Sequence, residues 1–120
     1  MKPVMAVSRK KALDYAEYIL SRPRRDYHVT LKRGRTGATL LHDGRAITKC
    51  HKSRVGALQT AFLAQALGVE VPRVGESATV EVPSGVLYRA VAISSLDFRK
   101  PEARSVLVQL LSVAARLRSS

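Results

Sequence analysis

The chain has few of the residues on which several common classes of protein depend. It contains one cysteine, Cys50, which excludes a disulfide within the chain and favours a reducing, cytoplasmic compartment. No apolar run approaches the roughly 20 residues that a membrane-spanning helix needs. A phosphate-cradling glycine loop between a strand and a helix is also missing, because Gly34 and Gly37 fall in a predicted hairpin. A disulfide scaffold, a membrane-spanning helix and a P-loop enzyme are therefore not expected.

Aromatic and acidic residues are also scarce. Tryptophan is absent and aromatic residues make up 5% of the chain, whereas proteins that bind single-stranded nucleic acid stack bases on aromatic rings. The carboxylates of the basic half, Asp14, Glu17, Asp26 and Asp43, are scattered over separate contexts. A metal-dependent nuclease needs such groups clustered. We therefore expect neither a cofactor nor a catalytic metal.

The histidines and the cysteine form no convincing chemical motif. His28, His42, Cys50 and His51 are ligand types for zinc, but adjacent residues of a strand point to opposite faces, so Cys50 and His51 do not easily share an ion. A histidine such as His28 could act as general base on an RNA 2′-hydroxyl. Its sequence neighbourhood offers no obvious acid partner. A small ribonuclease is therefore the third hypothesis, and we expect a protein without enzymatic activity.

Positive charge is what the chain has in excess, and this charge is unevenly distributed. Twenty-one Lys and Arg against nine Asp and Glu give a net charge of +12. Residues 1–54 hold fourteen basic and four acidic side chains, whereas residues 55–98 hold two basic and four acidic ones. Charge concentrated in one half of a chain favours a polyanionic partner, of which nucleic acid is the commonest.

Hydrophobic periodicity predicts an α+β fold in one domain, an antiparallel sheet with helices packed on it in the order α-β-β-β-α-β-β-α. Residues 8–67 form the basic α-β-β-β-α part, and 69–120 form a β-hairpin and a C-terminal helix. Asp43-Gly44 is the strongest hairpin signal. The expected elements are helices over 9–20, 54–67 and 102–118 and strands over 27–32, 38–42, 45–50, 78–82 and 86–93.

The basic residues of the first half gather at turns, strand ends and a helix start, where side chains and backbone N–H groups meet phosphates. Ser53 would cap the helix 54–67 and add its hydroxyl to an anion site. The predicted nucleic-acid-binding residues are Arg9, Lys10, Lys11, Arg24, Arg25, Lys32, Arg33, Arg35, Arg45, Lys49, Lys52, Ser53 and Arg54.

Residues 8–67 resemble the double-stranded-RNA-binding domain. The resemblance rests on the α-β-β-β-α order, the basic first helix, the Asp43-Gly44 turn and the segment 53–57 that opens the second helix. In that family the second helix opens with lysines that grip phosphates across a groove. Arg54 matches this pattern and Lys52 lies just before it, whereas Val55 and Leu58 depart from it. The resemblance implies binding of structured or double-stranded RNA.

Residues 36–67 are also similar to a three-strand-plus-helix DNA-binding module of integrases, in which the sheet enters the major groove. The tryptophan usual in that module is absent here. Structured RNA is therefore slightly favoured over DNA.

The rival hypothesis is an interaction protein, a small basic inhibitor or adaptor that docks on an acidic protein surface. The helix 102–118 has an unusually wide apolar face, formed by Val106, Leu107, Leu110, Leu111, Val113, Ala114 and Leu117. This face exceeds the stripe that one sheet face covers. Either the helix 54–67 or a second copy in a homodimer would cover the excess.

Overall fold

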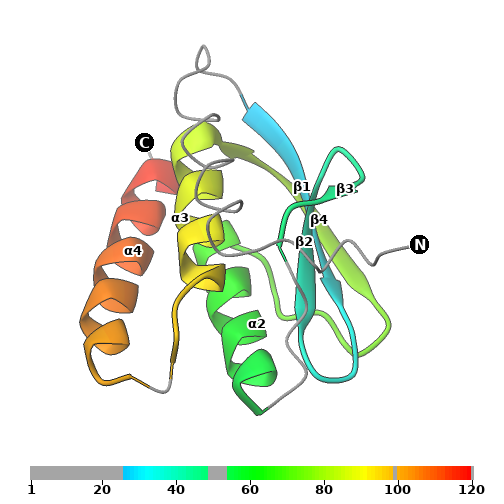
Figure 1. Ribbon diagram of the computed structural model, residues 1–120. Coiled ribbons are helices and arrows are strands. Elements are labelled where there is room, and N and C mark those ends of the chain that lie inside the picture. Colours follow the sequence, from blue (N-terminus) through cyan, green and yellow to red (C-terminus); the bar gives the residue numbers. More distant parts are fainter. Residues whose placement is uncertain (1–25, 49–53, 99, 120) are drawn as a thin grey trace.

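The computed structural model describes residues 26–48, 54–98 and 100–119, which form two layers (Figure 1). One layer is a four-stranded antiparallel sheet in the order β3-β2-β1-β4. The other layer, packed on one face of the sheet, consists of three helices. The elements are β1 (Asp26–Arg33), β2 (Ala38–His42), β3 (Arg45–Ala46), α2 (Arg54–Leu67), β4 (Ser77–Pro83), α3 (Ser84–Ser94) and α4 (Glu102–Ser119). The predicted α+β class with an antiparallel sheet is confirmed, whereas the predicted helix 9–20 lies outside the described residues.

Strand β1 is the centre of the sheet and follows the predicted alternation. Tyr27, Val29 and Leu31 are buried beneath the helices, whereas His28 and Lys32 are exposed on the opposite face. Successive side chains of a strand point to opposite faces, so each strand separates a core side from an outer side.

Two hairpins connect the first three strands. The Gly34 N–H donates to the Gly37 carbonyl at 2.7 Å in the turn between β1 and β2. Asp43 and Gly44 both have positive φ, 51° and 81°, the combination that a two-residue type I′ turn requires. Both turns were predicted from their glycines.

Strand β3 is shorter than the predicted strand 45–50. It ends at Ala46, although the Ile47 N–H still donates to the Leu40 carbonyl at 2.8 Å. The Leu40 N–H donates to the Thr48 hydroxyl oxygen at 2.9 Å, so a side chain replaces the carbonyl that a longer third strand would offer. The remaining residues of the predicted strand lie outside the described part.

Helix α2 begins and ends where predicted, at Arg54 and Leu67. Its C-terminus is closed by Gly68, whose φ of +77° places it in the left-handed region. The N–H groups of Gly68 and Val69 both donate to the Ala64 carbonyl, at 2.9 and 3.0 Å, as in the glycine caps common at helix ends.

The predicted strand 86–93 is wrong, because these residues belong to helix α3. Val86, Leu87, Ala90, Val91 and Ile93 are buried, and their spacing follows a helical face. β-branched residues favour strands in isolation, but packing between the sheet and α4 overrides that preference. The described part therefore has the order β-β-β-α-β-α-α.

Helix α4 packs against α3 and α2 through much of its apolar face. Leu107 and Ala114 are buried and Leu110 is half-buried, whereas Val106 and Val108 remain 41% and 57% exposed. Contacts within the chain thus cover the central stripe of the helix. The homodimer through residues 102–118 stays a prediction.

Arg118 fastens the end of α4 to the end of α2. Its Nη1 donates to the carbonyls of Gln65 and Ala66, at 3.0 and 2.5 Å. A Cβ added at Gly68 would lie 2.6 Å from Arg118 Nε. A cation at the carbonyl end of a helix also interacts favourably with the helix dipole.

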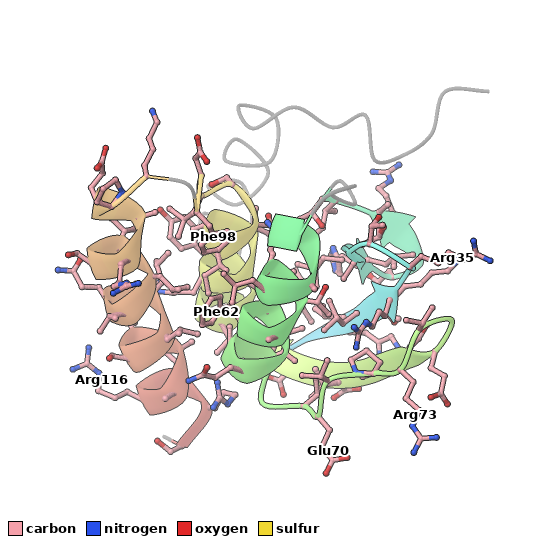
Figure 2. All side chains as sticks on the ribbon, turned by 90° about the horizontal axis from the view of Figure 1, so that it is seen from below. Arg35, Phe62, Glu70, Arg73, Phe98 and Arg116 are labelled. Carbon is pink, nitrogen blue, oxygen red and sulfur yellow. The ribbon has the colours of Figure 1, made fainter. Side chains whose placement is uncertain are left out.

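We expect Arg118→Ala to lower the free energy of unfolding by about 1 kcal/mol, because the carbonyls at the end of α2 lose a charged donor. Urea denaturation followed by circular dichroism measures this loss. Arg116→Ala is the matched control, since Arg116 is an exposed arginine of the same helical turn that points away from α2 (Figure 2). Equal losses in both variants would contradict the role of Arg118.

Candidate nucleic-acid interface

The structure describes the side chains of four predicted site residues, Lys32, Arg33, Arg35 and Arg45, and it places Arg54 as the first residue of α2. The other predicted phosphate contacts lie outside the described residues; they are Arg9, Lys10, Lys11, Arg24, Arg25, Lys49, Lys52 and Ser53.

Two turns from distant parts of the sequence meet at one end of the sheet. One is the hairpin Arg33–Gly37, and the other is the turn Arg73–Glu76 that leads into β4. The Arg33 N–H donates to the Glu76 carbonyl at 3.0 Å, and the Gly75 N–H donates to the Arg33 carbonyl at 2.9 Å. We call this arrangement the paired turns. Hydrogen bonds of both the N–H and the carbonyl of Arg33 fix its backbone.

The guanidinium of Arg33 holds the loop that precedes β4. Its Nη1 donates to the Pro72 carbonyl at 2.9 Å, and the side chain is half-buried. A planar guanidinium has five N–H donors, so one bond to Pro72 leaves others for a ligand. Arg33 therefore positions the paired turns in addition to contributing charge.

Arg35 and Arg73 are exposed and extend away from the body of the molecule at this end (Figure 2). Lys32, also exposed, precedes Arg33 on the outer side of β1, opposite Thr39 and Ser77. The sequence reasoning missed Arg73, because it lies in the half of the chain with no excess of basic residues. The only local signal is a turn-forming glycine, Gly75, two residues after it.

Arg45 does not join this group. It follows the Asp43–Gly44 turn and lies opposite His42, at the far end of β2 from the hairpin (Figure 1). His42 Nε2 lies 3.2 Å from Asp43 Oδ2 at that end. Among the described residues, the predicted basic side chains thus occupy two ends of the sheet, with three of the four at the paired turns.

The face of the sheet turned away from α2, α3 and α4 is mostly polar, and we call it the open face. Strand pairing assigns to it the residues His28, Thr30, Lys32, Thr39, Leu41, Ser77, Thr79 and Glu81. No Phe, Tyr or Trp belongs to this set. Tyr27 faces the core, and the rings of Phe62 and Phe98 stack on the helical side at 5.7 Å between centroids (Figure 2).

Within the described ranges, no group of three His, Cys, Asp or Glu side chains is placed to hold a metal ion. Over the same residues, no helix is both long and apolar enough to cross a membrane. Two of the predicted zinc-ligand types, Cys50 and His51, lie outside these ranges.

Comparison with known proteins gives no match to a protein-family model, to a curated protein or to a solved structure. The resemblances of residues 8–67 and 36–67 therefore stay predictions.

Replacing Arg33 with alanine should loosen the loop before β4, because the Pro72 carbonyl loses its donor. We expect the Glu76 N–H, which donates to the Arg73 carbonyl at 2.8 Å, to exchange with deuterium roughly fivefold faster, equivalent to about 1 kcal/mol of local stability. Arg35→Ala removes the same charge from the neighbouring turn and should leave this rate unchanged. A similar acceleration in both variants would contradict the positioning role of Arg33.

Proposed function

We propose that the protein binds nucleic acid through phosphate contacts centred on the paired turns. The observation that carries the proposal is the meeting of Lys32, Arg33, Arg35 and Arg73 at one rigid end of the sheet. Strand pairing brings Arg73 to this end from a separate part of the sequence. Side chains carried by a fixed backbone need less ordering of the chain when they bind.

The charge of the whole chain supports this proposal. The net charge of +12 attracts a polyanion at long range, and counterion release makes each arginine–phosphate contact favourable. Glu70 and Glu76 belong to the same loop as Arg73, so the loop alone has no net positive charge. The arginines of the hairpin are thus needed to make this end basic.

The start of helix α2 lies at the same end of the molecule as the hairpin (Figure 1). Lys52, Ser53 and Arg54 are next to one another in the sequence at that helix start. As predicted phosphate contacts, they would act together with the N–H groups of the first turn of the helix.

A duplex or a folded RNA suits this surface better than a flexible single strand. Among the described residues, the open face has no Phe, Tyr or Trp on which bases could stack, and stacking supplies much of the affinity of single-strand binders. Recognition by phosphates and shape, as in double-stranded RNA, needs none. Structured RNA is favoured over DNA only through the resemblance of residues 8–67.

A second candidate is docking on an acidic protein. Val71 and Val74, on either side of Arg73, are 45% and 53% exposed. Apolar side chains beside a cation suit a protein surface better than a row of phosphates. The two candidates differ in salt dependence, because phosphate contacts give a steep linear fall of log affinity with log salt.

We expect the double variant Arg35→Ala/Arg73→Ala to bind an RNA duplex of about 20 base pairs roughly tenfold more weakly than the unmodified protein. Loss of two phosphate contacts should also reduce the slope of log affinity against log salt by about two. Electrophoretic shifts at several salt concentrations measure both quantities, with duplex DNA and single-stranded RNA as competitors.

The matched control is Arg104→Ala/Arg116→Ala, which removes the same charge from exposed positions of α4. Its affinity should fall much less, because α4 lies at the opposite side of the molecule from Arg35 and Arg73 (Figure 2). An equal fall in both double variants would mean that only net charge matters. That result would reject the paired turns as the binding site.

A further inference from the structure

The open face carries three cross-strand rows of polar side chains between β1 and β4. His28 lies opposite Glu81, Thr30 opposite Thr79, and Lys32 opposite Ser77. Five of these six residues are exposed and Thr30 is half-buried. The three rows therefore follow one another along the strand pair. The first carries an imidazole and a carboxylate, the second two hydroxyls, and the third an ammonium group beside a serine hydroxyl.

The spacing of these rows suits one phosphodiester and its two neighbouring sugars. Residues directly opposite each other have Cβ atoms roughly 5 Å apart, and successive rows on one face are about 7 Å apart along the strand. A phosphate above the gap between the first and middle rows would have His28 of β1 and Glu81 of β4 on opposite sides, as an in-line displacement at phosphorus requires. The threonine hydroxyls would lie next to it, and the flexible Lys32 side chain would reach it along the strand.

The middle row is already organised. The hydroxyl oxygens of Thr30 and Thr79 lie 3.0 Å apart and share one hydrogen bond. Each threonine hydroxyl has one proton, so this bond uses one and leaves the other for a ligand. A phosphate oxygen is a suitable acceptor for that proton.

We infer that the open face is a cleavage site for RNA, with His28 and Glu81 as its acid–base pair. The inference rests on the proposed binding of nucleic acid and adds a reaction to it. Strand pairing supplies what the sequence did not reveal, a carboxylate partner for His28 from a distant strand, which acts as the base so that His28 acts as the acid.

The reaction is a transesterification that consumes no co-reactant. The Glu81 carboxylate takes the proton of a 2′-hydroxyl, and the 2′-oxygen forms a bond to phosphorus. The bond between phosphorus and the 5′-oxygen of the next nucleotide breaks, and the His28 imidazolium donates its proton to that oxygen. The products are a 2′,3′-cyclic phosphate and a 5′-hydroxyl, and proton exchange with water restores both side chains. Lys32 and the threonine hydroxyls stabilise negative charge on the phosphate oxygens.

The test uses the full chain and an end-labelled RNA hairpin with an unpaired loop, in buffer containing EDTA. We expect fragments that end in a 2′,3′-cyclic phosphate. The same hairpin made of DNA, or of 2′-O-methyl RNA, should stay intact because it lacks the nucleophile. His28→Ala and Glu81→Gln should each reduce the cleavage rate about 100-fold or more. Binding of the 2′-O-methyl hairpin should change less than about threefold, a difference of about 0.7 kcal/mol.

Glu102→Gln is the matched control, because it removes an exposed carboxylate of α4, outside both the open face and the paired turns, and should leave the rate unchanged. Identical circular dichroism spectra and unfolding midpoints verify that the variants fold, as expected for exposed positions. Cleavage that persists in both His28→Ala and Glu81→Gln would overturn the inference and identify a contaminating nuclease. Binding without cleavage would overturn this inference alone, whereas absence of binding to every nucleic acid would also overturn the proposed function.

Discussion

The pairing of β1 with β4 is the interaction on which both functional surfaces depend. The pairing runs from Asp26 opposite Pro83 to Lys32 opposite Ser77, and it joins the basic first half of the chain to the later half. Its register decides which residues meet. At one end it closes the paired turns around Arg33, and along the open face it brings Glu81 opposite His28. A shift of this register by two residues would preserve the core side of the sheet but separate both sets of groups.

Local features of the sequence predict most elements correctly but not their long-range arrangement. The alternation of β1, the Asp43–Gly44 turn and Gly68 at the end of α2 all follow from backbone preferences of a few neighbouring residues. Helix α3 was mistaken for a strand because Val86, Val91 and Ile93 are β-branched and the segment is apolar on several sides. Its helical form depends on burial against α4 and the sheet, which no local pattern reveals.

The candidate site, too, could be predicted only as far as local features of the sequence reveal it. Lys32, Arg33 and Arg35 are evident from the sequence as a cluster within one hairpin. Arg73 and Glu81 were not associated with them, because a loop and a register bring these residues together across a large separation in the chain. The role predicted for Arg33 was also incomplete, because only the structure shows that its guanidinium donates a hydrogen bond to the Pro72 carbonyl.

The helical layer gives the sheet a firm support through a few polar contacts in addition to its apolar core. Gln59, which is 1% exposed, donates from Nε2 to the Ser94 carbonyl at 2.7 Å and so ties α2 to the end of α3. Arg118 ties α4 to the end of α2. Hydrogen bonds of this kind between helices favour one arrangement of the helices over alternatives.

The strict alternation along β1 also determines which mutations this strand can accept. Tyr27, Val29 and Leu31 support the core, and the residues between them form the open face. Substitutions on the outer positions leave the packing intact, so the chemistry of that face can vary independently of stability. Insertion or deletion of one residue within the strand would instead disrupt the packing. It would move the polar side chains inward and the apolar ones outward in a single step, so the strand tolerates exchange of residues but not a change of length.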